Sequence, residues 1–161
     1  MFNDRVVINA SPLITLCKSG QEGLLPQLFH EIVVPSAVWD EVLMGGVEDP
    51  ACQKLSKMEW LRCKNSIQIA PVVQSWDLGP GETAVLSFAQ TNSRYIALVD
   101  DAAARRCASA LNIRVIGTLG VIVLARRRGL IQAVAPGLKS LKDAGLWISE
   151  ELISRLIKNE D

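Results

Sequence analysis

The stretch VVINASPLITL, residues 6–16, joins a buried strand to a helix start and decides the fold class. β-Branched residues lead into Asn9, and an apolar segment of helical period follows Ser11 and Pro12. Ser11 is expected to cap this helix, and Pro12 to occupy its first position. In α/β proteins the polar residue at such a strand end is commonly used for chemistry, so Asn9 is a candidate functional residue.

Short Val- and Ile-rich runs alternate with helical segments along the rest of the chain. The expected strands are 5–9, 31–34, 95–99 and 113–116, with a weaker one at 66–70. The expected helices are 11–19, 21–29, 35–43, 51–57, 81–91, 101–111 and 118–128. Near-continuous apolar strands separated by helices predict a parallel sheet covered on both faces, a three-layer α/β/α sandwich.

The segment after Gly129 differs from this alternation. RRRG, residues 126–129, places cations at the negative end of a helix dipole and Gly129 at its C-cap. Two short helices follow, the second capped by Ser149, and residues 130–161 are expected to pack on the rest as an appendage. Without a repeat or a linker, residues 1–161 are expected to form a single domain.

The bulk composition excludes several classes of protein. Hydrophobic residues make up 49% of the chain and charged residues 21%, which indicates a globular protein and not a disordered one. The 17 Lys and Arg residues equal the 17 Asp and Glu residues, which leaves room only for a local basic patch. With no signal peptide and no apolar run near the ~20 residues of a membrane helix, a cytoplasmic protein is expected.

Residues that often form sites elsewhere have structural explanations in this sequence. The four cysteines lie far apart and are expected to be buried thiols, and a single histidine, His30, cannot build a His-rich zinc site. The tryptophans form no stripe, so core or interface packing is favoured over base stacking: Trp39, Trp60, Trp76 and Trp147. The basic clusters 105–106 and 125–128 have two possible roles, helix capping or contact with RNA phosphates.

Three acidic residues share helix faces with apolar residues. Glu41 lies on the apolar side of its predicted helix, and Glu82 and Asp100 each begin an apolar stripe. Asp101 lies off that stripe and can pair with Arg105 one turn later. Glu82 and Asp100 taken singly are explained as residues of a first helical turn, whereas Glu41 lies beyond its first turn.

Taken together, these acids predict a cation site. Carboxylates that converge at one sheet edge cannot all remain ionised unless a cation neutralises them. Oxygen ligands without His or Cys favour Mg²⁺ or Mn²⁺. Such an ion activates water and stabilises charge on a phosphoryl group.

The chain resembles the PIN-domain nucleases, and in particular a PIN-like subfamily of prokaryotic proteins. The matching segments follow the expected order over nearly the whole chain: VVINASPLITL, IVVPSAVWDEV, LGPGETAVLSFA, ALVDDAAARRCASALNIRVIGTLGVIVLARRRGLI and LKDAGLWISEELI. The resemblance implies an α/β sandwich in which three or four acids bind one or two Mg²⁺ or Mn²⁺ ions. It also implies an RNA substrate, a small antitoxin-type protein partner as in toxin–antitoxin pairs, and a homodimer.

Carried over by position, the family's acids fall on Asn9, Glu41, Glu82 and the VDD segment, where Asp100 is favoured over Asp101. The departure is Asn9, whose amide oxygen can coordinate a metal but brings no negative charge. The resemblance therefore implies a metal-dependent ribonuclease in which these five residues are catalytic and the four acids hold the metal. The alternative is a catalytically weakened module that binds nucleic acid or protein.

Three further residues are candidate contacts for the substrate. Ser11 follows the first strand, Arg105 belongs to a basic cluster, and Thr118 begins the helix after GTLG, residues 117–120. Helix capping explains Ser11 and Thr118 equally well.

Overall fold

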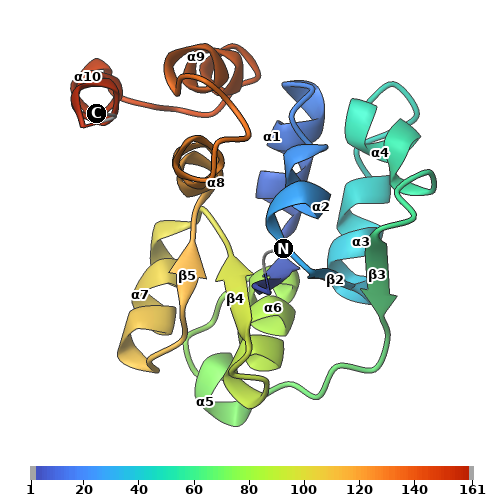
Figure 1. Ribbon diagram of the computed structural model, residues 1–161. Coiled ribbons are helices and arrows are strands. Elements are labelled where there is room, and N and C mark those ends of the chain that lie inside the picture. Colours follow the sequence, from blue (N-terminus) through green and yellow to red (C-terminus); the bar gives the residue numbers. More distant parts are fainter. Residues whose placement is uncertain (1–2, 160–161) are drawn as a thin grey trace.

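The computed structural model describes residues 3–159 and contains a five-stranded parallel sheet with the strand order β3-β2-β1-β4-β5 (Figure 1). Its strands are β1 (Arg5–Ile8), β2 (Glu31–Pro35), β3 (Leu61–Lys64), β4 (Tyr95–Leu98) and β5 (Val115–Ile116). Helices flank the sheet, so the predicted α/β/α sandwich is confirmed.

Ten helices are assigned within residues 3–159. They are α1 (Ala10–Lys18), α2 (Leu24–Leu28), α3 (Ser36–Leu43), α4 (Pro50–Leu55), α5 (Pro71–Gln74), α6 (Pro80–Thr91), α7 (Ala102–Ala110), α8 (Thr118–Arg127), α9 (Ala135–Asp143) and α10 (Glu150–Lys158). The last two form the segment expected as an appendage. Helix α9 contacts α1 and α8, and α10 contacts α9.

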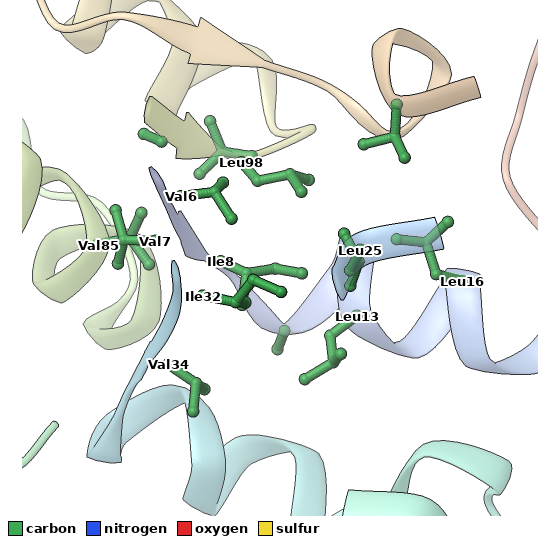
Figure 2. Packing of buried hydrophobic residues seen from close by; sticks show 14 of the residues in the cluster. Val6, Val7, Ile8, Leu13, Leu16, Leu25, Ile32, Val34, Val85 and Leu98 are labelled. Carbon is green, nitrogen blue, oxygen red and sulfur yellow. The ribbon is translucent and has the colours of Figure 1, made fainter. Parts of the chain in front are cut away.

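The alternation of side chains along β1 joins the two helical layers to the sheet. Val7 points toward Val85 of α6, whereas Ile8 lies on the side of the sheet that faces Leu13 of α1 (Figure 2). All four side chains are completely buried. Because a central parallel strand is covered on both faces, β1 is apolar without interruption.

All five strands run in the same direction, so their carboxyl ends share one edge of the sheet. Ile8 lies opposite Leu98 in the register of β1 and β4, and the N–H of Asn9 donates to the carbonyl of Leu98 at 3.1 Å. Asn9, Asp100 and Gly117 therefore follow three adjacent strands at this edge. Open α/β sheets bind ligands at such an edge.

The weak strand expected at 66–70 is wrong. Ser66 has a φ of 58°, and this segment forms no strand; the edge strand is instead β3, at Leu61–Lys64. In β3 only Leu61 is buried, so the strand lacks the apolar run that marks the others. The helix start expected at Ser11 is also wrong, because α1 begins at Ala10 with Asn9 in the N-cap position.

The helix ends near the appendage agree with the sequence. Gly129 follows α8 with a φ of 75°, the left-handed conformation expected of a C-terminal glycine. Ser149 caps α10, and its hydroxyl oxygen accepts a hydrogen bond from the N–H of Leu152 at 3.1 Å. No helix within residues 3–159 is both long and apolar enough to cross a membrane.

The cysteines depart in part from the buried positions expected of them, and the tryptophans differ in their exposure. All four thiols are free, and Cys17 and Cys107 are buried, but Cys63 is exposed on the edge strand β3. Burial raises the pKa of Cys17 to about 12, so this thiol is protonated and unreactive at neutral pH. Trp39 and Trp60 pack against the core, whereas the Trp147 side chain is exposed.

Candidate functional site

The carboxyl edge of the sheet brings Asn9 and Glu41 together over Gly81, the second residue of α6. A Cβ atom placed on Gly81 would lie 2.9 Å from Oδ1 of Asn9 and 3.1 Å from Oε1 of Glu41. Real Cβ atoms almost never approach an oxygen so closely, so only glycine leaves both oxygens in place. Residues from α3, from α6 and from the junction of β1 with α1, far apart in the sequence, thus meet at one point.

Asn9 contributes a polar atom that has no partner in the protein. The residue is only 2% exposed, and its Oδ1 accepts no hydrogen bond from the described residues. A buried acceptor without a donor costs about 1–3 kcal/mol, so native proteins rarely retain one without a reason. The orphaned oxygen, which lies over Gly81 near the Glu41 carboxylate, is therefore the strongest structural sign of a ligand site.

Glu41 and Glu82 supply two carboxylates to the same region. Partial burial raises the pKa of Glu41, and the negative charge of Glu82 raises it further. As whole residues, Glu41 is exposed and Glu82 is half-buried. The core therefore does not cover these two acids fully, although the sequence placed both on apolar helix faces. Their mutual repulsion means that a cation between them would stabilise both ionised forms.

Glu82 lies over the start of its own helix. Its Oε2 would be 2.7 Å from a Cβ atom on Gly79, the N-cap of α6, where Pro80 occupies the first position. The carboxylate thus lies close to the positive end of the helix dipole. The LGPGE turn places Glu82 at a helix start, and its two glycines leave room for the acidic side chains of the site.

Asp100, at the end of β4, is held by Thr118, the first residue of α8. The Thr118 N–H donates to Oδ1 at 2.8 Å, and the Thr118 hydroxyl donates to Oδ2 at 2.6 Å. Thr118 is completely buried, so its hydroxyl faces Asp100 and not the solvent. Asp100 therefore caps α8, a helix other than the one that follows it in the sequence.

Asp101 has a different role from its neighbour. It is exposed, and its side chain accepts a hydrogen bond from the N–H of Ala104 at 2.9 Å, which caps α7. The ion pair expected between Asp101 and Arg105 does not form among residues 3–159. Instead, Nη1 of Arg105 would lie 2.6 Å from a Cβ atom on Gly117, beside Oδ1 of Asp100.

Ser11 lies in the first turn of α1 and is exposed near Asn9. Its carbonyl accepts a hydrogen bond from the Thr15 hydroxyl at 2.9 Å. Because α1 begins one residue earlier, its hydroxyl is not used as the expected cap.

No three side chains of His, Cys, Asp or Glu within residues 3–159 lie close enough together to hold a metal ion. Asn9, which takes the position of one acid, carries an amide, and both oxygens of Asp100 accept hydrogen bonds from Thr118. The oxygen donors that do converge still suit Mg²⁺, which keeps several waters and needs only one or two protein carboxylates. Asn9, Glu41 and Glu82 therefore fit a hard divalent cation.

Gly81 and Gly117 are site residues that sequence reasoning missed. Each lacks the Cβ atom that would collide with a polar group of the edge, at Asn9 and Glu41 in one case and at Arg105 and Asp100 in the other. The signal in the sequence was a glycine beside a candidate residue: Gly81 directly precedes Glu82, and Gly117 precedes Thr118. Such a glycine marks a close approach of other atoms to the backbone.

A parallel α/β/α sandwich with oxygen-bearing side chains at its carboxyl edge is the architecture of α/β proteins that bind ligands at that edge. The chain belongs to the PIN-domain family, because a family model described as a PIN domain matches residues 5–161. No curated protein matches the chain in sequence. PIN domains have a nuclease-type fold, are generally metal-dependent, and often bind RNA and antitoxins.

Proposed function

We propose that the protein is a ribonuclease that uses Mg²⁺ or Mn²⁺ to hydrolyse RNA phosphodiester bonds. Membership of the PIN-domain family supports the reaction class. The observation that carries the proposal is the meeting of the Asn9 and Glu41 oxygens over Gly81, with the Glu82 charge acting on Glu41.

In this proposal Glu41 and Glu82 hold the metal through their carboxylates, and Asn9 contributes a neutral oxygen. The bound ion would supply a water of lowered pKa and would offset negative charge on the phosphoryl oxygens. Asp100, anchored by Thr118, would border the substrate from the adjacent strand end. We favour Asp100 over Asp101 because the Asp100 side chain is half-buried at the strand end, whereas Asp101 is exposed.

The second candidate function is a binding module for nucleic acid or protein that has lost turnover. The amide of Asn9 removes one negative ligand, and the two hydrogen bonds from Thr118 occupy Asp100. The first feature lowers the negative charge offered to a metal, and the second occupies acceptor sites that a metal would use.

A small antitoxin-type partner that silences the enzyme is a third arrangement, and co-purification with the product of a neighbouring gene would support it. A cytoplasmic location and a homodimer complete the proposal.

The test is cleavage of a defined single-stranded RNA in Mn²⁺, Mg²⁺ or EDTA by wild type, Glu82→Gln and Asn9→Asp. Glu59→Gln is the matched control, because Glu59 is exposed and precedes β3 at the opposite edge of the sheet. Metal-dependent cleavage that Glu82→Gln abolishes and Glu59→Gln retains is the expected result.

Two other outcomes would change the assignment. Cleavage by Asn9→Asp alone would identify a natural protein that has lost turnover through one substitution. Silence of all variants in every metal would contradict the nuclease proposal and favour the binding module.

A further inference from the structure

A groove of about 680 Å³ opens between α8 and α10. It lies beside the carboxyl edge of the sheet, which we call the acidic edge because Glu41, Glu82 and Asp100 lie there. Its walls are mainly apolar side chains of these two helices, including Leu119, Val123, Leu152 and Leu156. Helix α10 lies at the periphery of the molecule, next to α9 and away from the sheet (Figure 1). We call this feature the Trp147 groove, after the aromatic side chain in its wall.

Trp147 presents its indole ring to solvent from a fixed position. The residue is 86% exposed, although its neighbour Ile148 is only 4% exposed and Leu146 packs against the core. The buried neighbours hold the backbone on both sides, so the exposed ring is not part of a loose chain end. An exposed tryptophan in a groove wall offers a large flat surface for stacking.

Two arginines give the groove a positive charge. Arg105 from α7 and Arg127 from the last turn of α8 both line it. Within residues 3–159 neither guanidinium group forms an ion pair or a hydrogen bond. By contrast, the neighbouring Arg128 donates to the carbonyl of Leu28 and to the Asp4 carboxylate. The groove therefore offers two guanidinium groups that are complementary to phosphate.

The Trp147 groove is continuous with the acidic edge. Asp100 and Gly117 line the groove and also follow β4 and β5 at the carboxyl edge of the sheet. The missing Cβ of Gly117 allows the Arg105 guanidinium to lie against the backbone beside Asp100. Arg105 thus borders both the carboxyl edge of the sheet and the Trp147 groove.

We propose that the Trp147 groove is a subsite for an unpaired nucleotide of single-stranded RNA. The base stacks on Trp147 against the apolar wall, and Arg105 and Arg127 bind the flanking phosphates. The inference rests on the proposed function in one respect, that the same RNA strand passes the acidic edge. It differs from the prediction for Trp147 from sequence, which favoured packing, because the ring is exposed beside two arginines.

The experiment measures the affinity of a labelled single-stranded RNA octamer by fluorescence anisotropy in EDTA, where no metal-dependent cleavage occurs. Trp147→Ala is expected to weaken binding about tenfold, whereas Trp147→Phe retains a stacking ring and most of the affinity. Arg127→Gln is expected to weaken binding severalfold. It should also reduce the slope of log affinity against log salt concentration by about 0.7, the value for one phosphate contact on a single strand. Arg94→Gln is the matched control, because exposed Arg94 precedes β4 at the opposite edge.

The outcomes separate this proposal from the proposed function. Metal-dependent cleavage with unchanged affinity in Trp147→Ala and Arg127→Gln would overturn the subsite and retain the nuclease. Weakened binding in both variants without cleavage by wild type would support the subsite and contradict the nuclease. Equal affinity for duplex and single-stranded octamers, or no RNA binding by wild type, would also overturn the subsite and favour a protein ligand for the groove.

Discussion

The carboxylate of Asp100 and the buried residue Thr118 form a two-point contact that joins β4 to α8. The backbone N–H of Thr118 lies 2.8 Å from one carboxylate oxygen, and its hydroxyl lies 2.6 Å from the other. The contact places negative charge at the positive end of α8. It also fixes the chain around Gly117, between the acidic edge and the Trp147 groove.

Replacing Thr118 with valine should destabilise the protein. Valine keeps the size of the side chain but removes the hydroxyl, which costs about 1.5–3 kcal/mol when the lost partner is a charged group. Urea denaturation measures the change in the free energy of unfolding. Thr91→Val is the control, because the exposed Thr91 hydroxyl donates only to carbonyls of its own helix, and its change should remain within about 0.5 kcal/mol. Equal effects of the two substitutions would contradict the special role of the Asp100–Thr118 contact.

Replacing Gly81 with alanine should weaken metal binding more than it changes the free energy of unfolding. The added methyl group would lie 2.9 Å from Asn9 Oδ1 and 3.1 Å from Glu41 Oε1, so it must push the two oxygens apart. Alanine is favoured over glycine in a helix by about 1 kcal/mol, which offsets part of the cost of the collision. We expect Mn²⁺ affinity, measured by calorimetry, to fall by about tenfold or more, equivalent to about 1.4 kcal/mol.

The matched control for Gly81→Ala is Gly23→Ala. No atom lies within 4 Å of a Cβ placed on Gly23, and its φ of −64° suits alanine. The control should bind Mn²⁺ as wild type does. Full Mn²⁺ affinity in Gly81→Ala would show that the oxygens over Gly81 do not form the metal site.

Replacing Asn9 with aspartate should make stability depend on metal. The side chain is 2% exposed and faces Glu41, so a new charge there lacks solvation and is repelled; we expect a loss of about 2–4 kcal/mol in EDTA. Mn²⁺ at 100 times its dissociation constant should restore about 2.7 kcal/mol. Thermal denaturation with and without Mn²⁺ measures both effects. Asn65→Asp, at an exposed loop position, should show neither, and an Asn9→Asp variant that Mn²⁺ fails to stabilise would contradict the site.

The interaction between Glu31 and Tyr95 should make the free energy of unfolding depend on pH. The hydrogen bond from Tyr95, together with Arg62 and Arg5, lowers the pKa of Glu31. A lowered carboxyl pKa stabilises the fold above the unfolded value of about 4.3, and this stabilisation is lost as the pH falls through the folded value. Burial and the hydrogen bond to Glu31 raise the pKa of Tyr95 to about 12, so its contribution is lost as the pH rises from about 10 toward 12.

Tyr95→Phe removes the hydrogen bond but keeps the ring that packs edge-on against Phe88. We expect the free energy of unfolding to fall by about 1 kcal/mol at pH 7. It should then decline less than that of wild type as the pH is lowered into the acid range or raised toward about 12. Urea midpoints over a pH series measure this. Parallel pH profiles for wild type and Tyr95→Phe would contradict the coupling.

The sandwich could be predicted from the sequence because its signals are local. Uninterrupted apolar strands such as β1 require cover on both faces, and helix ends such as Gly129 and Ser149 follow from backbone geometry and capping. Edge strand β3 was missed because three of its four residues are exposed and carry no apolar pattern. The same locality identified Glu41, Glu82 and Asp100 as unusual acids on apolar helix faces.

Only the tertiary structure decided how those acids are used. Neighbouring carboxylates at Asp100 and Asp101 cap two different helices, because the strand end turns one toward α8 and leaves the other at the start of α7. The meeting of Asn9 with Glu41 over Gly81 joins three elements that are distant in sequence. Helical and strand periods specify which face a side chain occupies, whereas the atoms that it meets depend on how separate elements pack.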